Sequence, residues 1–180
     1  MKKILFIYLL TMVFITAYAQ ESSSKRLGFG IYGGIQLPDD VNLDTGPWFG
    51  AFVNFPTGLG WSLQLEYNLW KSNENGADKT VTLSEFPLLV AHKWDIDNVY
   101  IQLLFGPGIA NVSSENSIYG ENSDFSLSFD VALKVGLVIT KNADGFIQLR
   151  KQLTGSPNFG GGLPAYSSWL VGLGIQYSLN

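Results

Sequence analysis

Residues 167–180 read Ser-Ser-Trp-Leu-Val-Gly-Leu-Gly-Ile-Gln-Tyr-Ser-Leu-Asn, and side chains of two kinds alternate along them. One face is apolar and holds Trp169, Val171, Leu173, Ile175, Tyr177 and Leu179. The other face is mostly small or polar and holds Ser168, Gly172, Gly174, Gln176 and Ser178. A repeat of two residues is that of a β-strand, because successive strand side chains point to opposite sides. From Trp169 to Tyr177 the apolar face covers roughly 26 Å along the strand, or about 20 Å at a tilt of about 40°, which matches the apolar band of an outer-membrane barrel.

Seven more stretches with strand character precede this one, at 27–37, 47–55, 59–70, 81–94, 99–112, 125–139 and 146–153. The connections between the stretches are alternately long and short, as in single-chain outer-membrane barrels with long outer loops and short periplasmic turns. The sequence therefore predicts an all-β fold, an eight-stranded antiparallel up-and-down transmembrane β-barrel with both termini in the periplasm. Pro87, inside the fourth stretch, predicts a bulge or strained pairing.

The N-terminal segment has the three parts of a secretory signal. Lys2 and Lys3 precede an apolar run that ends near Ile15, and Ala17-Tyr18-Ala19 supplies a small-residue cleavage motif. The apolar run is too short for a spanning helix. We therefore expect a cleaved signal peptide over 1–19 and a single outer-membrane barrel domain over 20–180.

The composition narrows the classes of protein. The chain has 11 basic and 15 acidic residues, for a net charge of −4, and no cysteine. A basic patch for nucleic acid is not expected from this balance, and a lipoprotein anchor, a disulfide framework and a thiolate metal site are excluded. Charged residues make up 14% of the chain, against about 25% in soluble domains. Since no spanning helix follows residue 19, a closed barrel is the expected way to satisfy the backbone in lipid.

Charged side chains in the predicted strands fall mainly on the face opposite the apolar one. They are Glu66, Glu85, Asp130, Lys93, Lys134 and Arg150. A Lys or Arg facing lipid at the midplane costs about 2–4 kcal/mol, so these charges are expected inside. The third and seventh strands face each other in a barrel of eight, so we expect Arg150 to reach toward Glu66. We predict a structural ion network in a packed interior, with a proton path or ligand site as the alternative.

An acidic outer loop is predicted over 113–124. Its side chains of interest are Glu115, Tyr119, Glu121 and Asp124. Because loops carry function more often than strands, this loop is the candidate site for a protein partner. The alternative is a solvated loop without a partner.

No catalytic, cofactor or metal site is predicted. His92 is the only histidine, and at the periplasmic end of its strand it is expected to be an interfacial residue, since base catalysis needs an oriented partner. Asp40, Asn42 and Asp44 have the spacing of a calcium loop but lack its Gly and Glu. The run 160–162 is three glycines that open no helix, which favours a loop tip over a phosphate site.

Three functions fit these observations to different degrees. The first is a small non-enzymatic outer-membrane barrel, structural or acting as a membrane-embedded subunit that presents outer loops to a partner, with membrane lipid around it. The second is a soluble periplasmic lipocalin-like barrel that binds an apolar ligand, which would need Leu63, Leu65 and Ile175 to line the cavity. The third, a lipid A-modifying enzyme, lacks a visible pair of nucleophile and base.

Several short motifs also resemble a known family. They are Gly28-Phe29-Gly30, the runs 58–67 and 83–90, Tyr100-Ile101-Gln102, Gly106-Pro107-Gly108, Arg150 and the run 172–177. Together they resemble the PorT-like outer-membrane β-barrel proteins of Bacteroidetes-type bacteria. The resemblance implies an outer-membrane barrel in which Pro87 is expected, and a namesake associated with a secretion and gliding apparatus. This chain departs from the family's pattern at Lys151-Gln152, where an aromatic is usual, and at 178–180, where a terminal Phe is usual.

Overall fold

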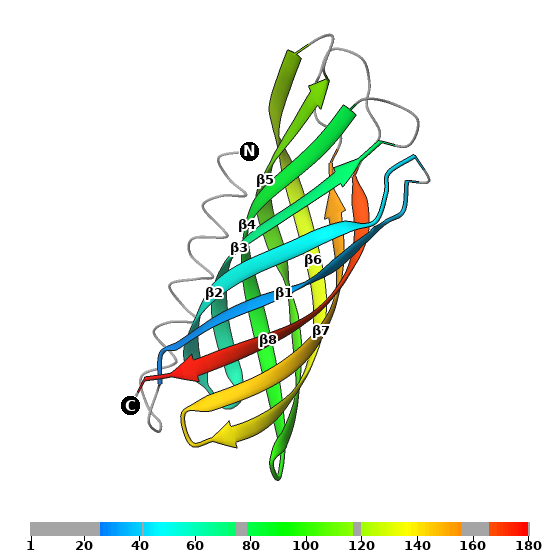
Figure 1. Cartoon of the computed structure of the whole chain (residues 1–180). Helices are drawn as coiled ribbons and strands as arrows, with labels where there is room; N and C mark the ends of the chain where they lie inside the picture. The colour runs from blue at the N-terminus through cyan, green and yellow to red at the C-terminus, as the bar shows by residue number, and fades with distance from the viewer. Residues whose placement is uncertain (1–25, 41, 75–78, 117–119, 156–165, 180) are drawn as a thin grey trace, which may run out of the picture.

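The computed structural model describes residues 26–40, 42–74, 79–116, 120–155 and 166–179, which form one closed β-barrel (Figure 1). Its strands are β1 (Gly28–Pro38), β2 (Gly46–Gly58), β3 (Trp61–Asn73), β4 (Lys79–Ile96), β5 (Val99–Asn116), β6 (Gly120–Thr140), β7 (Ala143–Thr154) and β8 (Ser167–Ser178). Each strand pairs antiparallel with the next, and β8 closes the barrel on β1. The predicted all-β, eight-stranded, up-and-down barrel is confirmed. The predicted signal peptide, 1–19, lies outside the described residues, and no described helix is long and apolar enough to cross a membrane.

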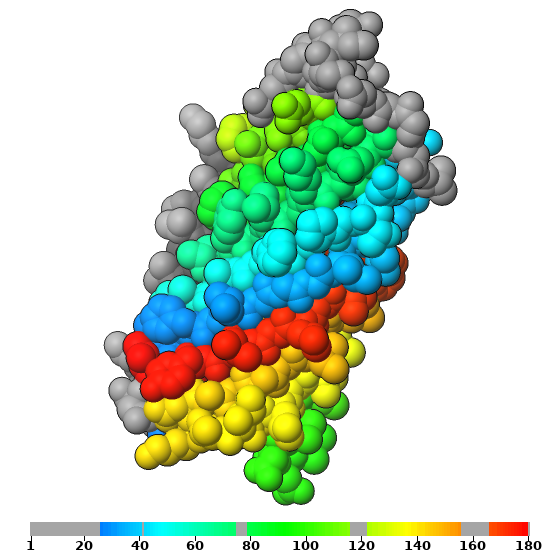
Figure 2. Space-filling view, viewed as in Figure 1, coloured from blue at the N-terminus to red at the C-terminus, as the bar shows by residue number. Residues whose placement is uncertain are grey.

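The two faces of the strands are those predicted from the period of two. In β6 every second side chain from Phe125 to Ile139 is apolar and faces outward, with 41% to 73% of its surface exposed. The inward side chains between them, such as Asp130 and Lys134, are buried. The outer surface is continuous across β1, β2, β7 and β8, which run as diagonal bands around the barrel (Figure 2).

Glycine on the inward face makes room for large rings in the lumen. A Cβ at Gly50 would lie 2.2 Å from the Tyr32 ring, and a Cβ at Gly136 would lie 2.1 Å from the Tyr100 ring. Both rings fold across a glycine of the neighbouring strand, because the register places these residues directly opposite each other. The barrel is therefore filled by side chains that need bare backbone beside them.

The same inward and outward assignment contradicts the lipocalin-like alternative, in which the apolar face predicted for the strands lines the lumen. Leu65 and Ile175 lie on the outer surface, with 48% and 59% of their surface exposed. Leu63 is on the same face of its strand as Leu65, although neighbouring side chains leave only 9% of it exposed. The lipocalin-like alternative, which needs these residues to line a cavity, is therefore wrong.

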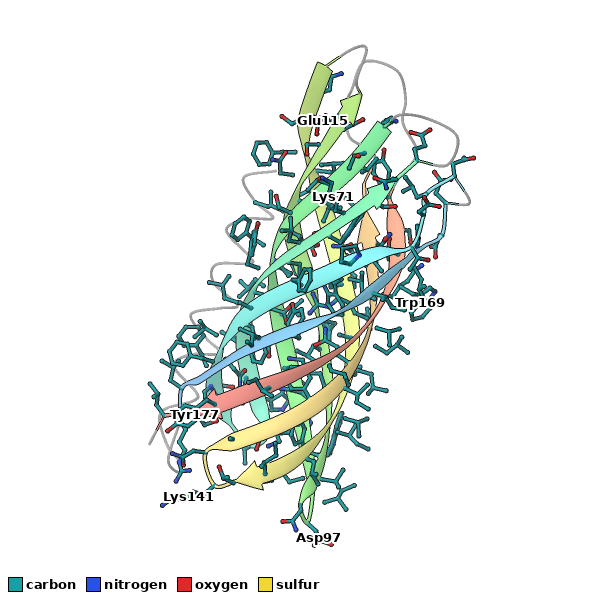
Figure 3. The ribbon with its side chains drawn as sticks, viewed as in Figure 1. Lys71, Asp97, Glu115, Lys141, Trp169 and Tyr177 are labelled. Atoms are coloured by element: carbon teal, nitrogen blue, oxygen red, sulfur yellow. The ribbon has the colours of Figure 1, made fainter. Side chains whose placement is uncertain are left out.

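Three short turns lie at one end of the barrel, which we call the short-turn end. They are 59–60, 97–98 and 141–142, and Figure 3 shows Asp97, Lys141 and Tyr177 toward this end. The strand predicted from residue 59 begins two residues later, because Leu59 and Gly60 form the turn with φ of 53° and 81°. Positive φ values do not fit an extended strand, so the chain reverses here.

The opposite, long-loop end carries a projecting wall. Strands β4 and β5 have 18 residues each and β6 has 21, against 11 to 13 in the other five strands. Figure 1 shows these three strands rising beyond the rest of the barrel. The loop predicted over 113–124 is therefore wrong in large part, since 113–116 and 120–124 are strand. The mostly polar residues of this stretch lack the alternation of apolar and polar side chains from which strands were predicted. Strands β5 and β6 nevertheless remain paired here, as Glu115 opposite Glu121 shows.

The side-chain pattern reverses within this wall. In the body of the barrel Phe86 faces outward and Glu85 inward. Two residues nearer the long-loop end, Ser84 faces outward and Leu83 is fully buried inside. Beyond that level β4 and β5 are polar outside and mainly apolar inside, as in a water-soluble barrel, whereas β6 is polar on both faces. The reversal marks where the apolar outer band ends.

Pro87 interrupts pairing without a bulge. The ladder from β3 to β4 passes from Leu65 opposite Leu88 to Asn68 opposite Glu85 at constant register, with the intervening pairs missing. Of the two alternatives predicted at Pro87, the bulge is wrong and the pairing is disturbed instead, because the missing N–H removes a ladder hydrogen bond without adding a residue. Register shifts occur at 56–58 and 138–140, next to turns.

Candidate functional site

The centre of the lumen holds a buried ion cluster built on Arg150 of β7. Its guanidinium pairs with Glu66 of β3 across the barrel, and its Nη1 lies 3.3 Å from Oδ2 of Asp130 on β6. All three side chains are fully buried. Each of these three charged residues faces the interior because side chains alternate between the two faces of a strand. Closure of the barrel places β3 opposite β7.

Neutral polar side chains complete the partners of Glu66. Tyr32 donates its hydroxyl hydrogen to Glu66 Oε2 at 2.8 Å, and Gln64 donates to Oε1. Lys134 Nζ donates to Gln64 Oε1 at 3.2 Å and lies 4.0 Å from the centre of the Phe52 ring. Tyr32 and Gln64 were not predicted in the network. Their positions on the inward face of their strands could have indicated it.

Glu85 lies in the same layer and is bound by amides. Asn68 Nδ2 donates to Glu85 Oε2 at 3.2 Å, and Gln152 Nε2 donates to the same oxygen at 2.5 Å. Trp70 in turn donates its indole N–H to Gln152 at 2.8 Å, so β3, β4 and β7 are tied together. Hydrogen bonds to charged groups are stronger than neutral ones, which makes this layer a brace across the barrel.

Lys93, predicted in the network, lies outside it. Its Nζ pairs with Asp95 at 3.0 Å, lies 4.2 Å from the Tyr100 ring centre and keeps 31% of the side chain exposed. It lines a polar cavity of 410 Å³ at the short-turn end together with Gln102. The alternation of faces along β4 correctly predicted that Lys93 faces inward. The position of a residue along its strand sets its height in the barrel, and Lys93 lies too close to the turn to reach the ion cluster.

An apolar cap closes the lumen on the long-loop side of the ion cluster. Its fully buried members include Trp48, Trp70, Leu83, Val112 and Leu170. Eight strands enclose an interior just wide enough for side chains. Cap and ion cluster therefore fill the long-loop side and the centre of the described lumen in two successive layers, and the polar cavity lies on the short-turn side of them.

The acidic partner-loop residues are spread over the projecting wall. Glu115 is exposed near the end of β5, and the backbone of Glu121 lies directly opposite in β6. Asp124 lies further along β6, where its carboxylate accepts from the backbone N–H of Phe125 at 2.8 Å. Tyr119 lies outside the described residues. Figure 3 shows Glu115 at the far end of the wall.

His92 lies between two aromatic rings near the short-turn end. Its ring centre is 4.5 Å from that of Trp61 and 4.4 Å from that of Trp94. Trp94 and His92 are on the outward face of β4, at the level where barrels carry aromatic girdles. This placement agrees with an interfacial residue.

The motif with calcium-loop spacing forms a local turn. Asp40 Oδ1 accepts from the backbone and side-chain nitrogens of Asn42 at 2.9 and 3.0 Å, which is a local turn. The glycines at 160–162 lie outside the described residues. Within the described ranges, no group of three or more His, Cys, Asp or Glu side chains gathers as a metal cluster.

Lys151, which faces outward, is held at the long-loop rim. It pairs with Asp39 in the connection after β1, and its Nζ lies 5.1 Å from the Trp169 ring centre. Ser167 also donates to Asp39 at 2.6 Å. The hydrogen bonds from Lys151 and Ser167 hold the pKa of the Asp39 carboxyl below its usual value. Figure 3 shows Trp169 at this end, opposite to Tyr177 at the other end of β8.

Comparisons with known proteins agree with this geometry. A family model described as outer membrane protein beta-barrel domain matches residues 6–180. Neisserial surface protein A has a TM-score of 0.70 at 12% identity, over 88% of this chain and 100% of its own. The N-terminal barrel domain of Pseudomonas aeruginosa OprF has a TM-score of 0.62 at 13% identity, over 88% and 100%. Ail of Yersinia pestis, in complex with the heparin analogue sucrose octasulfate, has a TM-score of 0.51 at 14% identity, over 85% and 97%. No curated protein matches by sequence.

Proposed function

We propose that this chain, which belongs to the outer membrane protein β-barrel domain family, is a non-enzymatic protein that presents its projecting wall to a protein partner. The chain is a small eight-stranded outer-membrane β-barrel protein. We further propose that the N-terminal 19 residues are a cleaved signal peptide and that the short-turn end is periplasmic. Short turns on the periplasmic side and longer loops outside are the rule in this class, which supports that orientation.

The observation that carries the proposal is the reversal of polarity in β4 and β5, beside which the outer face of β6 also turns polar. Below Ser84 the outer face is apolar and suited to lipid, and above it the outer face turns polar while Leu83 and Val112 are fully buried. A wall that only anchored the barrel would have no need of its own apolar core beyond the band. A folded, water-facing extension instead offers a fixed surface, which lowers the entropy cost of binding.

The filled lumen supports a binding role over transport. Arg150, Glu66 and Asp130 block the centre of the described barrel, and the cap with Trp48 and Trp70 lies beyond them. Passage of a solute would require several buried ion pairs and hydrogen bonds to break together. A binding role needs no such rearrangement.

The chemistry of the wall favours a basic partner. Glu115 is exposed near the end of β5, and the neighbouring strand β6 brings the acidic residues Glu121 and Asp124 to the same wall. Acidic residues on the wall favour a basic protein, because complementary charges guide two partners together. The sulfated ligand of Ail is anionic and does not fit this part of the wall. A place within a PorT-like secretion assembly is consistent with such a partner.

Site-specific photocrosslinking in growing cells tests the proposal. A photoreactive residue at Ser113, which faces outward in the wall, is expected to give a discrete crosslinked protein, and the double variant Glu115→Gln/Glu121→Gln is expected to weaken that band. The matched control is the same residue at Thr57, beside the short turn at 59–60. The proposal fails if the wall position gives no crosslink, or if reconstituted vesicles pass small sugars through the barrel.

A further inference from the structure

Strand β6 has an uncovered edge where it rises beyond β7. The ladder between these two strands ends with Ser128 opposite Thr154, and one further bond runs from the Gly155 N–H to the Leu127 carbonyl. From there β6 continues to Gly120 at the top of the wall (Figure 1). Over 120–126 it pairs with β5 alone among the described residues. We call the side of 121–126 that faces away from β5 the free edge.

The free edge offers backbone hydrogen-bonding groups at every second residue. Successive residues of an antiparallel strand point their N–H and C=O groups to opposite neighbours, so Ser123 and Phe125 point to the same side as Leu127. The Phe125 N–H is already bound by the Asp124 carboxylate at 2.8 Å. The Ser123 N–H and the carbonyls of Ser123 and Phe125 have no backbone partner among the described residues. These groups are placed to pair with an added strand.

Apolar side chains are uncovered at the same edge. Phe125 and Leu127 keep 72% and 73% of their surface exposed, whereas Phe129, which has β7 beside it, keeps 43%. Phe125 belongs to the same cross-strand row as Asn111 and Ser84, the first polar row of the outer face. An added strand would cover these two side chains and pair with the backbone at the same time.

The chain's own sequence after β7 is a poor occupant of the edge. If the ladder of Ser128 opposite Thr154 continued, Pro157 would stand opposite Phe125. A proline has no N–H to donate to the Phe125 carbonyl, so it cannot complete this ladder. The pairing must come from another polypeptide.

A second copy of the chain is also disfavoured. Two barrels in one membrane have their β6 strands running in the same direction, so a two-fold axis along the membrane normal brings the edges together as parallel strands. Each residue would then stand beside its own copy, with Asp124 beside Asp124. Like charges opposite each other destabilise a strand pair.

Charges beside the edge favour a basic strand. The run 120–128 contains acidic residues and no Lys or Arg, and Glu115 is exposed on the neighbouring strand β5. Because side chains alternate along an added strand, one set would lie beside Phe125 and Leu127 and the other beside Asp124. The first set is expected to be apolar and the second basic.

We propose that the free edge of β6 binds an extended segment of the partner protein, with alternating apolar and basic side chains, as an added β-strand. This inference rests on the proposed function and specifies how the wall holds its basic partner. In such complexes the main-chain hydrogen bonds supply affinity and the alternating side chains supply specificity. A long strand edge without a partner is otherwise a site of uncontrolled pairing.

Binding of a synthetic peptide to the full barrel refolded in detergent tests the edge. The probe is a short fluorescent peptide of alternating lysine and valine, followed by fluorescence anisotropy at physiological salt. Its control has the same sequence and charge but an N-methylated backbone, which cannot donate hydrogen bonds. The plain peptide should bind, and the control should bind at least about tenfold more weakly, because several backbone hydrogen bonds are lost.

A matched pair of variants separates backbone pairing from side-chain contact. Ser123→Pro removes the N–H on the free side and leaves the pairing with β5 in place, as proline on an edge strand can. Ser123→Ala removes the hydroxyl and keeps the N–H. The proline variant should raise the dissociation constant of the plain peptide about tenfold, and the alanine variant should match the unmodified protein. Equal circular dichroism spectra and thermal midpoints check that both barrels are folded.

The photocrosslink from Ser113 distinguishes failure of this inference from failure of the proposed function. Ser113 lies opposite Ser123 on β5, within reach of a partner held at the edge or elsewhere on the outer face. Loss of the crosslinked band in Ser123→Pro but not in Ser123→Ala supports the edge. A full band in Ser123→Pro overturns the edge and leaves the proposed function standing. No band in the otherwise unmodified protein refutes the proposed function and the inference that rests on it.

Three further results would overturn the proposal. Equal affinity for the plain and N-methylated peptides would show attraction by charge without strand pairing. Binding of the peptide only after 158–163 is replaced by a short Gly-Ser linker would show that the chain covers its own edge. A dimer of the purified barrel that Ser123→Pro converts to a monomer would make a second copy the occupant.

Discussion

Replacing Arg150 with Ala removes the centre of the buried ion cluster. Arg150 is fully buried and pairs with both Glu66 and Asp130. Glu66 would keep the hydrogen bonds from Tyr32 and Gln64, whereas Asp130 would lose its ion-pair partner. Breaking a buried pair from one side costs about 3–5 kcal/mol, because the remaining charge stays buried without compensation. With a urea m-value of about 2 kcal/mol/M, the unfolding midpoint should fall by about 1.5–2.5 M.

Urea unfolding of the barrel in lipid vesicles, followed by tryptophan fluorescence, measures this change. Arg150→Lys keeps the charge but not the two-armed guanidinium, so it should fall between the wild type and the Ala variant. Lys151→Ala is the neighbouring control, because its ion pair is partly exposed and is worth about 0–1 kcal/mol. If Arg150→Ala unfolds at the urea concentration of the wild type, the ion cluster does not brace the barrel and the reasoning is refuted.

Two further predictions follow from the faces of the strands and from the long-loop rim. Leu133→Arg places a charge on the outward face near the middle of β6 and should lower the free energy of unfolding in vesicles by about 2–4 kcal/mol. Thr82→Arg, above the apolar band, should change the free energy of unfolding by less than about 0.5 kcal/mol. Equal losses of stability in the two variants would contradict the polarity reversal. Because the pKa of Asp39 is lowered in the folded state, its stabilising contact with Lys151 is present above the pKa of the unfolded chain and lost as the pH falls through the folded pKa. Lys151→Ala should therefore lower the thermal midpoint slightly at pH 7 and match the wild type in acid, and a difference that persists at low pH would show that packing on Trp169 carries the effect.

Periodicity predicted the body of the barrel because lipid imposes a strict rule there. An outward residue in the band is apolar, and the inward residues of β6 are mostly small or polar, so β6 could be assigned face by face from Phe125 to Ile139. The same rule carried Arg150 and Glu66 into the lumen. Closure of eight strands then supplied the long-range contact that no local pattern contains.

The rule failed where water replaces lipid. Beyond Ser84 the chain needs no apolar outer face, so the strand ends of β4, β5 and β6 looked like loops although their backbones pair. The height of a residue along the barrel axis could not be predicted from the sequence either. Alternation of faces did not distinguish Lys93, near a turn, from Lys134 in the central layer, because the stagger between strands sets the height of each residue.

The most direct test of a closed barrel that presents its wall outside is labelling of single cysteines on intact cells. The chain has no cysteine of its own, so a cysteine at Ser113 or at Asp97 is a unique target for a membrane-impermeant maleimide. We predict rapid labelling at 113, in the wall, and no labelling at 97, in the short turn, until the outer membrane is opened. Labelling at 97 with protection at 113 would reverse the orientation, and labelling at both on intact cells would contradict a barrel that spans the membrane with a filled lumen.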